Sequence, residues 1–103
     1  MLDKIKALVA ARRVNWKKHA LRRILERQVS RERVFVSLAA GEIIEVHELE
    51  RPLVSCLVLG YYNGKALHVV AAVDGRENVL WIITVYEPSL IEWREDMKTR
   101  RRS

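Results

Sequence analysis

The spacing of apolar residues along the chain changes character near Gly41. Before this glycine, apolar residues recur three and four positions apart, as they do on one face of a helix. After it, they form short runs rich in Val, Ile, Leu and Tyr, which are typical of strands. The pattern therefore predicts helices in the first part of the chain and a sheet in the second.

Residues 3–13 and 15–28 both have a helical pattern, which leaves open whether they form one long helix or two. In the second range, one stripe at helical spacing predicts the buried face. This stripe consists of Ala20, Leu21, Ile24, Leu25 and Gln28. His19 and Arg23 lie away from the stripe, and Arg27 lies on its flank.

A further helix is predicted over residues 31–40, where the signals for both ends are clearest. Ser30 is placed to cap the first turn. Val29 and Val34 are placed as a hydrophobic staple across the helix start. Gly41 follows as the residue after the C-cap.

Four segments after Gly41 predict strands, namely 42–46, 55–62, 65–73 and 79–86. Residues 47–54 are predicted to be a connection, because Pro52 opposes regular pairing. Residues 89–99 predict a short closing helix, followed by a basic tail. The predicted fold class is α+β, a single domain over residues 1–103. In it, basic N-terminal helices pack on a mainly antiparallel sheet of about four strands, and a short C-terminal helix closes the chain.

The turn at Asn63-Gly64 fixes a register, since this dipeptide is the strongest short signal for a two-residue hairpin loop. Leu59 should then pair with His68, and Ser55 with Ala72. One face of the hairpin is almost wholly apolar and is the better candidate to pack under the helices. It carries Cys56, Val58, Gly60, Leu67, Val69, Ala71 and Val73.

The other face of the hairpin is mixed and carries His68. If residues 74–78 form a five-residue loop, Thr84 pairs with His68 and Tyr86 pairs with Ala66. His68, Thr84 and Tyr86 then cluster on the mixed face. A shift of the loop by one residue would send Thr84 and Tyr86 to the opposite face.

The positive charge is concentrated at the two ends of the chain. Residues 1–33 hold eleven Lys and Arg against three acids, a net charge of +8. Residues 34–96 hold four Lys and Arg against ten acids, a net charge of −6, and residues 97–103 add +4. This polarity favours a polyanionic partner such as nucleic acid, although a solvated charged surface gives the same pattern.

Other features of the composition narrow the classes of protein. Cys56 is the single cysteine and suits a reducing cytoplasm. No pair of His or Cys has metal-ligand spacing, so no metal site is expected. No apolar run has the length of a membrane span, and no signal peptide is visible.

His68 and Tyr86 have the side chains that proton transfer and hydrogen bonding require. Arginines stabilise the charge that develops on a phosphate. Metal-independent cleavage of RNA needs only these groups, because the attacking 2′-hydroxyl comes from the substrate, and no cofactor is expected. His68 can equally be a half-buried strand histidine, and His19 with its arginines a solvated helix face.

Several ordered segments together resemble a family of small prokaryotic proteins known as domain of unknown function 4258. These are HALRRILERQVSRERV, LAAGEIIE, SCLVLGYYNGKALHVVAAVD, ITVYEP and DMKTRR, which span roughly residues 15–102. That family is placed with the RelE-like toxins, in the superfamily of barnase-like and colicin-like ribonucleases. The resemblance implies a helical start before an antiparallel sheet and the toxin of a type II toxin–antitoxin pair.

The resemblance also implies site residues. His19, Arg23, His68, Thr84 and Tyr86 match the segments that would carry catalysis. The residues that would bind RNA phosphates are Arg27, Lys98, Arg100 and Arg101. The implied partners are RNA, including ribosome-bound messenger RNA, and a cognate antitoxin, which in this class often has a zinc-finger portion of the MqsA/YgiT type.

The leading hypothesis is a small cytoplasmic ribonuclease toxin that cleaves messenger RNA without a metal. His19 or His68 would transfer the proton, and Tyr86 would orient or donate. The alternative is a non-catalytic module of the same fold that binds RNA or an antitoxin. A third hypothesis is a structural partner that does not bind RNA. If the helices cover the apolar sheet face, His19 and Arg23 reach His68 only around an edge of the sheet, which predicts either two sites or one helix that borders the groove.

Overall fold

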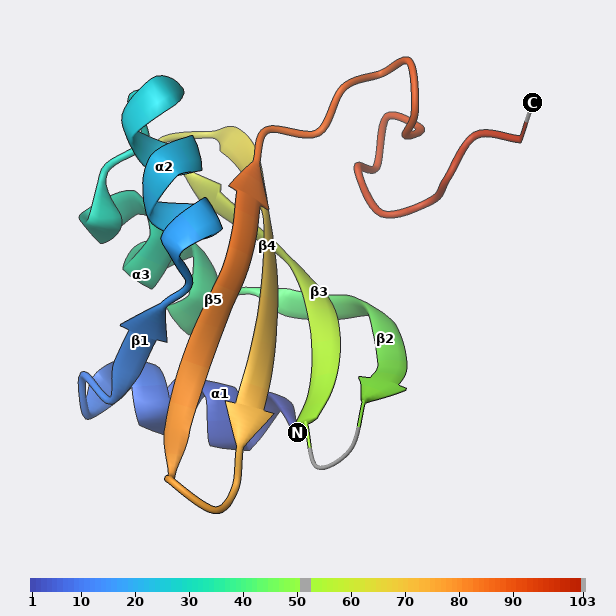
Figure 1. Cartoon of the computed structure of the whole chain (residues 1–103). Coiled ribbons are helices and arrows are strands. Elements are labelled where there is room, and N and C mark those ends of the chain that lie inside the picture. Colours follow the sequence, from blue (N-terminus) through green and yellow to red (C-terminus); the bar gives the residue numbers. More distant parts are fainter. Residues whose placement is uncertain (51–52, 103) are drawn as a thin grey trace.

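The computed structural model describes residues 1–50 and 53–102. It consists of three helices and five strands. In chain order these are α1 (Leu2–Ala10), β1 (Val14–Trp16), α2 (Lys18–Glu26), α3 (Arg31–Ala39), β2 (Glu42–Glu50), β3 (Leu53–Tyr62), β4 (Lys65–Asp74) and β5 (Val79–Tyr86). The strands form one sheet in the order β1-β5-β4-β3-β2 (Figure 1).

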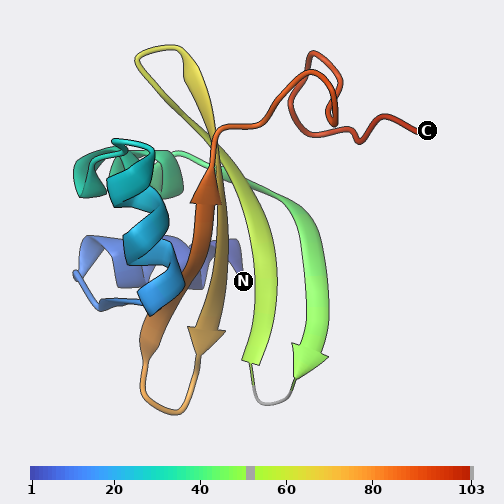
Figure 2. The same ribbon diagram turned by 45° about the horizontal axis from the view of Figure 1, so that its top comes forward.

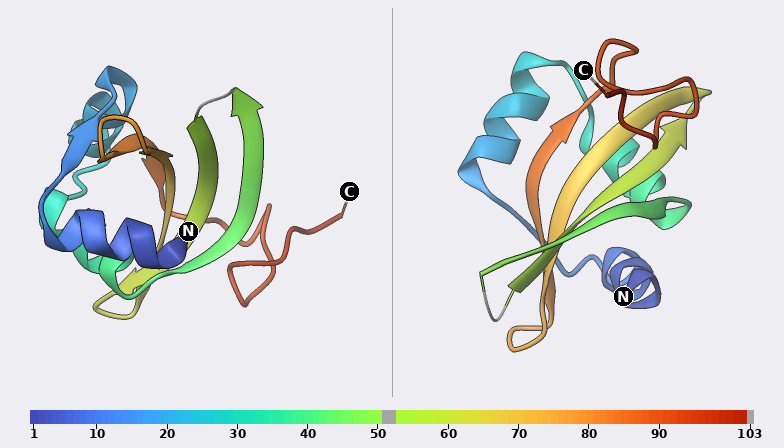
Figure 3. Two further views of the ribbon diagram at one scale, coloured as in Figure 1. Left: turned by 90° about the horizontal axis from the view of Figure 1, so that it is seen from below. Right: turned by 90° about the vertical axis from the view of Figure 1, so that its right-hand side faces the viewer.

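The helices lie on one side of the sheet. Residues 87–102, which follow β5, lie on the other side (Figures 2 and 3). The apolar face of the β3–β4 hairpin packs under the helices as predicted, since Cys56, Val58, Leu67, Val69 and Ala71 belong to the buried core. Ile5, Ile24 and Leu38 of the three helices complete that core. The helices therefore provide stability on one face and leave the mixed face for the C-terminal residues.

The predicted sheet of about four strands was wrong, because the sheet has five strands and is mixed. The additional strand is β1, which pairs in parallel with β5. Backbone hydrogen bonds from Lys17 N to Ile82 O and from Leu80 N to Arg13 O extend this pairing. The strand has three residues and lies inside a helical pattern, so its sequence carries no strand signal. It separates α1 from α2, and the range 3–28 thus holds two helices.

The predicted C-terminal helix was also wrong, since residues 87–102 contain only turns and one isolated bridge. The Asp96 carboxylate accepts hydrogen bonds from the backbone N–H groups of Lys98 and Thr99 and from the Thr99 hydroxyl. Such side-chain bonds compete with helical ones. Met97 adopts φ 62°, which reverses the chain and lets Trp93 pair with Arg100.

The predicted register of the β3–β4 hairpin is confirmed, with Leu59 opposite His68 and Ser55 opposite Ala72. The predicted register between β4 and β5 was wrong. Asp74 pairs with Val79, which shortens the loop by one residue, and a bulge next to Val70 inserts one residue into β5. Together the shorter loop and the bulge shift the pairing of β5 with β4 by two residues, so each side chain near Tyr86 stays on its predicted face. Tyr86, rather than Thr84, therefore lies opposite His68.

The helix signals had a mixed outcome. Ser30 caps α3, with its hydroxyl accepting a hydrogen bond from the Arg33 backbone N–H at 3.0 Å. Leu25, however, is 79 % exposed and Gln28 is exposed too, so their place in the predicted buried stripe was wrong. The predicted connection over 47–54 was wrong in part, because β2 continues to Glu50 and β3 begins at Leu53; Pro52 lies outside the described residues.

Close contact between α3 and β3 leads to the first prediction. A Cβ atom at Gly60 would lie 2.2 Å from the Ser37 carbonyl oxygen, whereas a Cβ at Gly75 would have no atom within 4 Å. We expect Gly60→Ala to lower the free energy of unfolding by about 2–3 kcal/mol, because backbone atoms must move apart. Gly75→Ala is the matched control, with an expected change within about 0.5 kcal/mol. Urea denaturation of both variants measures this, and equal stability of the two would contradict the prediction.

Candidate active site

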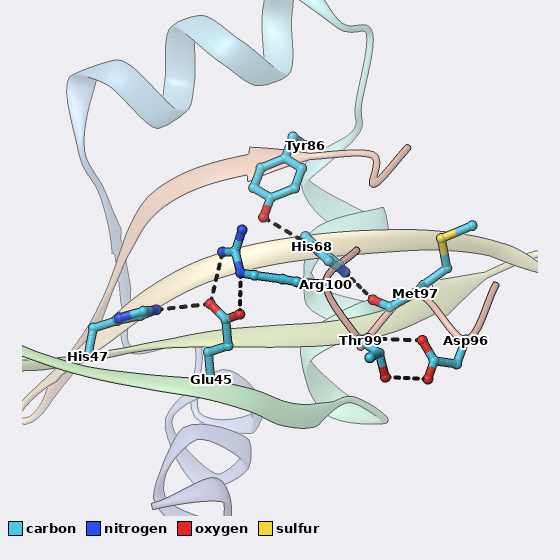
Figure 4. Close-up of polar contacts among 8 residues, drawn as sticks. All are labelled: Glu45, His47, His68, Tyr86, Asp96, Met97, Thr99 and Arg100. Atoms are coloured by element: carbon cyan, nitrogen blue, oxygen red, sulfur yellow. Dashed lines mark hydrogen bonds and ion pairs between the residues drawn. The ribbon is translucent and has the colours of Figure 1, made fainter. Parts of the chain in front are cut away.

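His68 lies at the centre of the polar contacts on the mixed face of the sheet (Figure 4). Its side chain is fully buried. The Nε2 atom lies 2.6 Å from the Met97 carbonyl oxygen, and the Nδ1 atom lies 3.1 Å from the Tyr86 hydroxyl. Because a carbonyl only accepts, Nε2 carries the proton and Nδ1 accepts a hydrogen bond from Tyr86. Both ring nitrogens are thus engaged in hydrogen bonds.

Two aromatic rings enclose the imidazole. Tyr86 and Trp93 contact it edge-to-face, with ring centroids 5.1 and 4.6 Å from that of His68. Burial lowers the pKa of His68, and the hydrogen bond to Met97 opposes this only in part. Burial likewise raises the pKa of Tyr86. The pair is therefore neutral at physiological pH, with the Tyr86 hydroxyl protonated.

Arg100 and Glu45 form a bidentate ion pair beside Tyr86 (Figure 4). The Nε and Nη2 atoms of Arg100 lie 2.6 and 3.0 Å from the two carboxylate oxygens. The hydrogen bond from Arg100 lowers the pKa of Glu45 despite partial desolvation. The guanidinium also stacks 4.5 Å from the centre of the Trp93 ring. These contacts attach the C-terminal segment to β2, which runs along the sheet edge.

A cavity of about 600 Å³ opens between the end of β5, α2 and the C-terminal segment. It is lined by Arg27, Tyr86, Glu87, Ser89, Glu92, Trp93 and Arg100. Arg27, the C-cap residue of α2, donates a hydrogen bond to the Val85 carbonyl at 2.7 Å. The C-terminal end of α2 thus borders the cavity through Arg27, whereas His19 and Arg23 do not line it.

The structure gathers four of the predicted site residues and places the others elsewhere. His68 and Tyr86 meet, and Tyr86, Arg27 and Arg100 line one cavity. His19 is exposed and Arg23 is half-buried on α2, where the Arg23 side chain lies 3.4 Å from His19 Nε2 and 3.3 Å from Glu26.

The remaining predicted residues have other contacts. Thr84 pairs with Val70. Lys98 contacts Glu42 at 3.4 Å, and Arg101 donates to the carbonyls of Leu90 and Trp93.

Sequence reasoning missed Glu45, Glu92 and Trp93. Glu45 was assigned to an edge strand, and the other two were assigned to the closing helix. The signal that was available for Trp93 is its place as a large apolar residue in an otherwise polar segment, which marks a residue that the fold buries.

Two structural observations concern metals and membranes. Among residues 1–50 and 53–102, no group of three His, Cys, Asp or Glu side chains is arranged to hold a metal ion. None of the helices in the same residues has both the length and the apolar character needed to cross a bilayer.

The burial of His68 predicts a dependence of stability on pH. The lowered pKa means that the unfolded chain binds more protons below the ordinary value of 6.5. The free energy of unfolding should thus be at its full value above 6.5 and fall as the pH drops towards the lowered pKa. The carboxyls of Glu45 and Asp96 take up protons only at lower pH, since the pKa of Asp96 is about 2 and that of Glu45 lies below 4.5.

We expect wild-type protein to lose stability as the pH falls below 6.5, and His68→Gln to show a shallower slope there. Urea denaturation at a series of pH values measures both slopes. The amide of Gln keeps a hydrogen-bond donor and an acceptor but does not titrate, so the variant removes the ionisation of residue 68 and keeps its hydrogen-bonding capacity. Identical slopes for the two proteins would exclude His68 as the titrating group.

Comparison with known proteins gives one match, to a protein family described as domain of unknown function (DUF4258), over residues 16–87. No curated protein and no solved structure has significant similarity to the chain. The matched residues begin in β1 and end just after Tyr86, so they include α2, α3, the other four strands and the His68–Tyr86 pair. The chain belongs to the family of the domain of unknown function DUF4258.

Proposed function

We propose that the protein is a RelE-like toxin of a type II toxin–antitoxin pair, a metal-independent endoribonuclease that cleaves messenger RNA in the cytoplasm. Its partners are then RNA and a cognate antitoxin, for which the zinc-finger MqsA/YgiT type is one candidate. The observation that carries this proposal is the cavity that Arg27, Tyr86 and Arg100 line together. Guanidinium groups hold phosphates, and a positioned hydroxyl can donate a proton.

Tyr86 is the residue through which the site would donate a proton. Its raised pKa keeps the hydroxyl protonated, and His68 fixes the ring from behind. His68 is a positioning residue in this scheme, because it is fully buried and both of its nitrogens are engaged. The hydroxyl can rotate from Nδ1 towards a ligand in the cavity without movement of the ring.

Glu92 supplies a carboxylate on the same cavity wall. In the proposed reaction, the 2′-oxygen of the RNA attacks the adjacent phosphorus and gives its proton to Glu92. The bond from phosphorus to the 5′-oxygen breaks, and that oxygen takes the proton of Tyr86. Solvent then restores the proton of Tyr86 and removes that of Glu92. The products are a 2′,3′-cyclic phosphate and a free 5′-hydroxyl, and Arg27 and Arg100 stabilise the transition-state charge.

The second candidate function is binding of RNA without cleavage. The observation that favours it is the balance of charge in the cavity, where Glu87 and Glu92 offset Arg27 and Arg100. Arg100 is also paired with Glu45 at 2.6 Å. A site of this charge holds a phosphate less strongly than an unpaired arginine cluster does. In that function His19 and Arg23 on α2 would contact the RNA backbone.

The test is inducible expression in a bacterial host, with growth and messenger RNA integrity followed together. We expect the wild type to arrest growth and deplete messenger RNA, with cyclic phosphate at the new ends. Tyr86→Phe should slow cleavage by about a hundredfold, which is the usual size of a general acid contribution. Tyr61→Phe removes the same hydroxyl from a residue that is 49 % exposed on β3, so it is the matched control and should behave as wild type.

Expression must be equal for all variants, which an immunoblot checks. If the wild type leaves growth and messenger RNA unchanged, the ribonuclease proposal fails. A gel-shift assay with purified protein then separates the other candidates. Binding that weakens in Arg23→Ala supports the RNA-binding module, and the absence of any binding excludes both functions.

A further inference from the structure

A second hollow lies on the opposite side of the sheet, between two helices. It has a volume of about 370 Å³ and is lined by Lys6, Val9, Ala10, Arg12, Phe35, Val36 and Ala39. We refer to these residues as the α1–α3 groove. The floor is apolar, and Val36 is 39 % exposed there. Ala10 and Ala39 are also exposed, and their small side chains allow another backbone to come close.

The charged residues of the groove have one sign. Lys6 and Arg12 line it, and among the side chains that the structure describes no acidic one does. The nearest acids along the two helices, Asp3 and Glu32, do not line the groove. Residues 1–33 carry a net charge of +8 in total. A ligand that fits this surface needs an apolar stripe with negative charge beside it.

The Phe35 ring is already occupied, which bears on the class of ligand. The Arg12 guanidinium stacks 4.3 Å from the ring centre, and Trp16 contacts the ring edge-to-face at 6.1 Å. A nucleic-acid base needs an open aromatic face to stack on. The apolar floor between two helices instead matches the mode in which an amphipathic helix lays its apolar side into a groove.

We infer that the α1–α3 groove docks an acidic amphipathic helix of a partner protein. Apolar residues of that helix at positions i, i+3, i+4 and i+7 contact Val36, Ala39 and Ala10, and its flanking carboxylates face Lys6 and Arg12. The inference is independent of the ribonuclease proposal, because the groove lies on the helical side of the sheet and shares no residue with the cavity at Tyr86.

The experiment is fluorescence polarisation with three labelled probes and the purified full chain. The first probe is a capped helical peptide of about 18 residues with leucines at the spacing above and flanking glutamates. The second has the same leucines with lysines in place of the glutamates. The third is a single-stranded RNA of about 12 nucleotides. We expect the acidic peptide to bind at least about tenfold more tightly than the basic peptide, with affinity that falls as salt screens the charges.

Variants locate the binding. Val36→Asp and Arg12→Glu should each weaken the acidic peptide by about tenfold or more, since they place negative charge at the floor and rim. The matched controls are Val46→Asp, at a side chain that is 53 % exposed on β2, and Arg76→Glu in the loop after β4. Neither control should alter binding, and circular dichroism checks that all four variants fold.

Three outcomes overturn the inference. The first is no binding of the acidic peptide, and the second is equal binding of the acidic and basic peptides. The third is binding that the two groove variants leave unchanged. If the RNA binds and the groove variants weaken it while neither peptide binds, the groove is a nucleic-acid surface. Loss of RNA cleavage in the Tyr86 experiment has no bearing on these results, so failure of one proposal is distinguishable from failure of the other.

Discussion

The need to satisfy a fully buried imidazole governs how the second face of the sheet is built. His68 points away from the helices, and an unpaired polar group at that depth would cost about 1–3 kcal/mol. One ring nitrogen is satisfied by Tyr86, on the neighbouring strand, and the other by the Met97 carbonyl from the C-terminal segment. The segment crosses the sheet to make this bond, and in doing so it brings Trp93 over the imidazole and Arg100 onto Glu45. The cavity at Tyr86 is the space that this crossing leaves.

Elements with local signals could be predicted from the sequence, and elements set by distant contacts could not. The cap at Ser30 and the turn at Asn63-Gly64 depend on a few neighbouring residues, and both are confirmed. Strand β1 exists because β5 offers it a parallel edge more than sixty residues away, which three residues of sequence cannot reveal. The C-terminal segment has helical spacing, but the turn at Asp96 and the burial of Trp93 outweigh that local preference.

The candidate site shows the same division. That His68 and Tyr86 share a face followed from strand alternation, and this part survived the wrong loop length because the bulge restored the parity. Arg27 and Arg100 were expected to bind phosphates, but nothing in the sequence brought them to one cavity. The sequence did not predict Glu45 and Glu92 as site residues, because their contacts depend on the path of the C-terminal segment. Proton-transfer roles for His68 also change once its burial is known, since an enclosed neutral imidazole orients another group more readily than it exchanges protons itself.

The two faces of the sheet are covered by elements that are held in different ways. The core lies under the helices on one face, and the cavity lies beside the C-terminal segment on the other. The helical face is a contiguous apolar cluster that extends from Ile5 to Val85 and does not include Trp93. The C-terminal segment is held by a small number of specific contacts, chiefly the Trp93 ring, the Arg100–Glu45 pair and the Met97 carbonyl. A region held in this way opens at a lower free energy than the core it covers. Opening of this segment therefore does not require the helices to leave the sheet, because they pack on its opposite face.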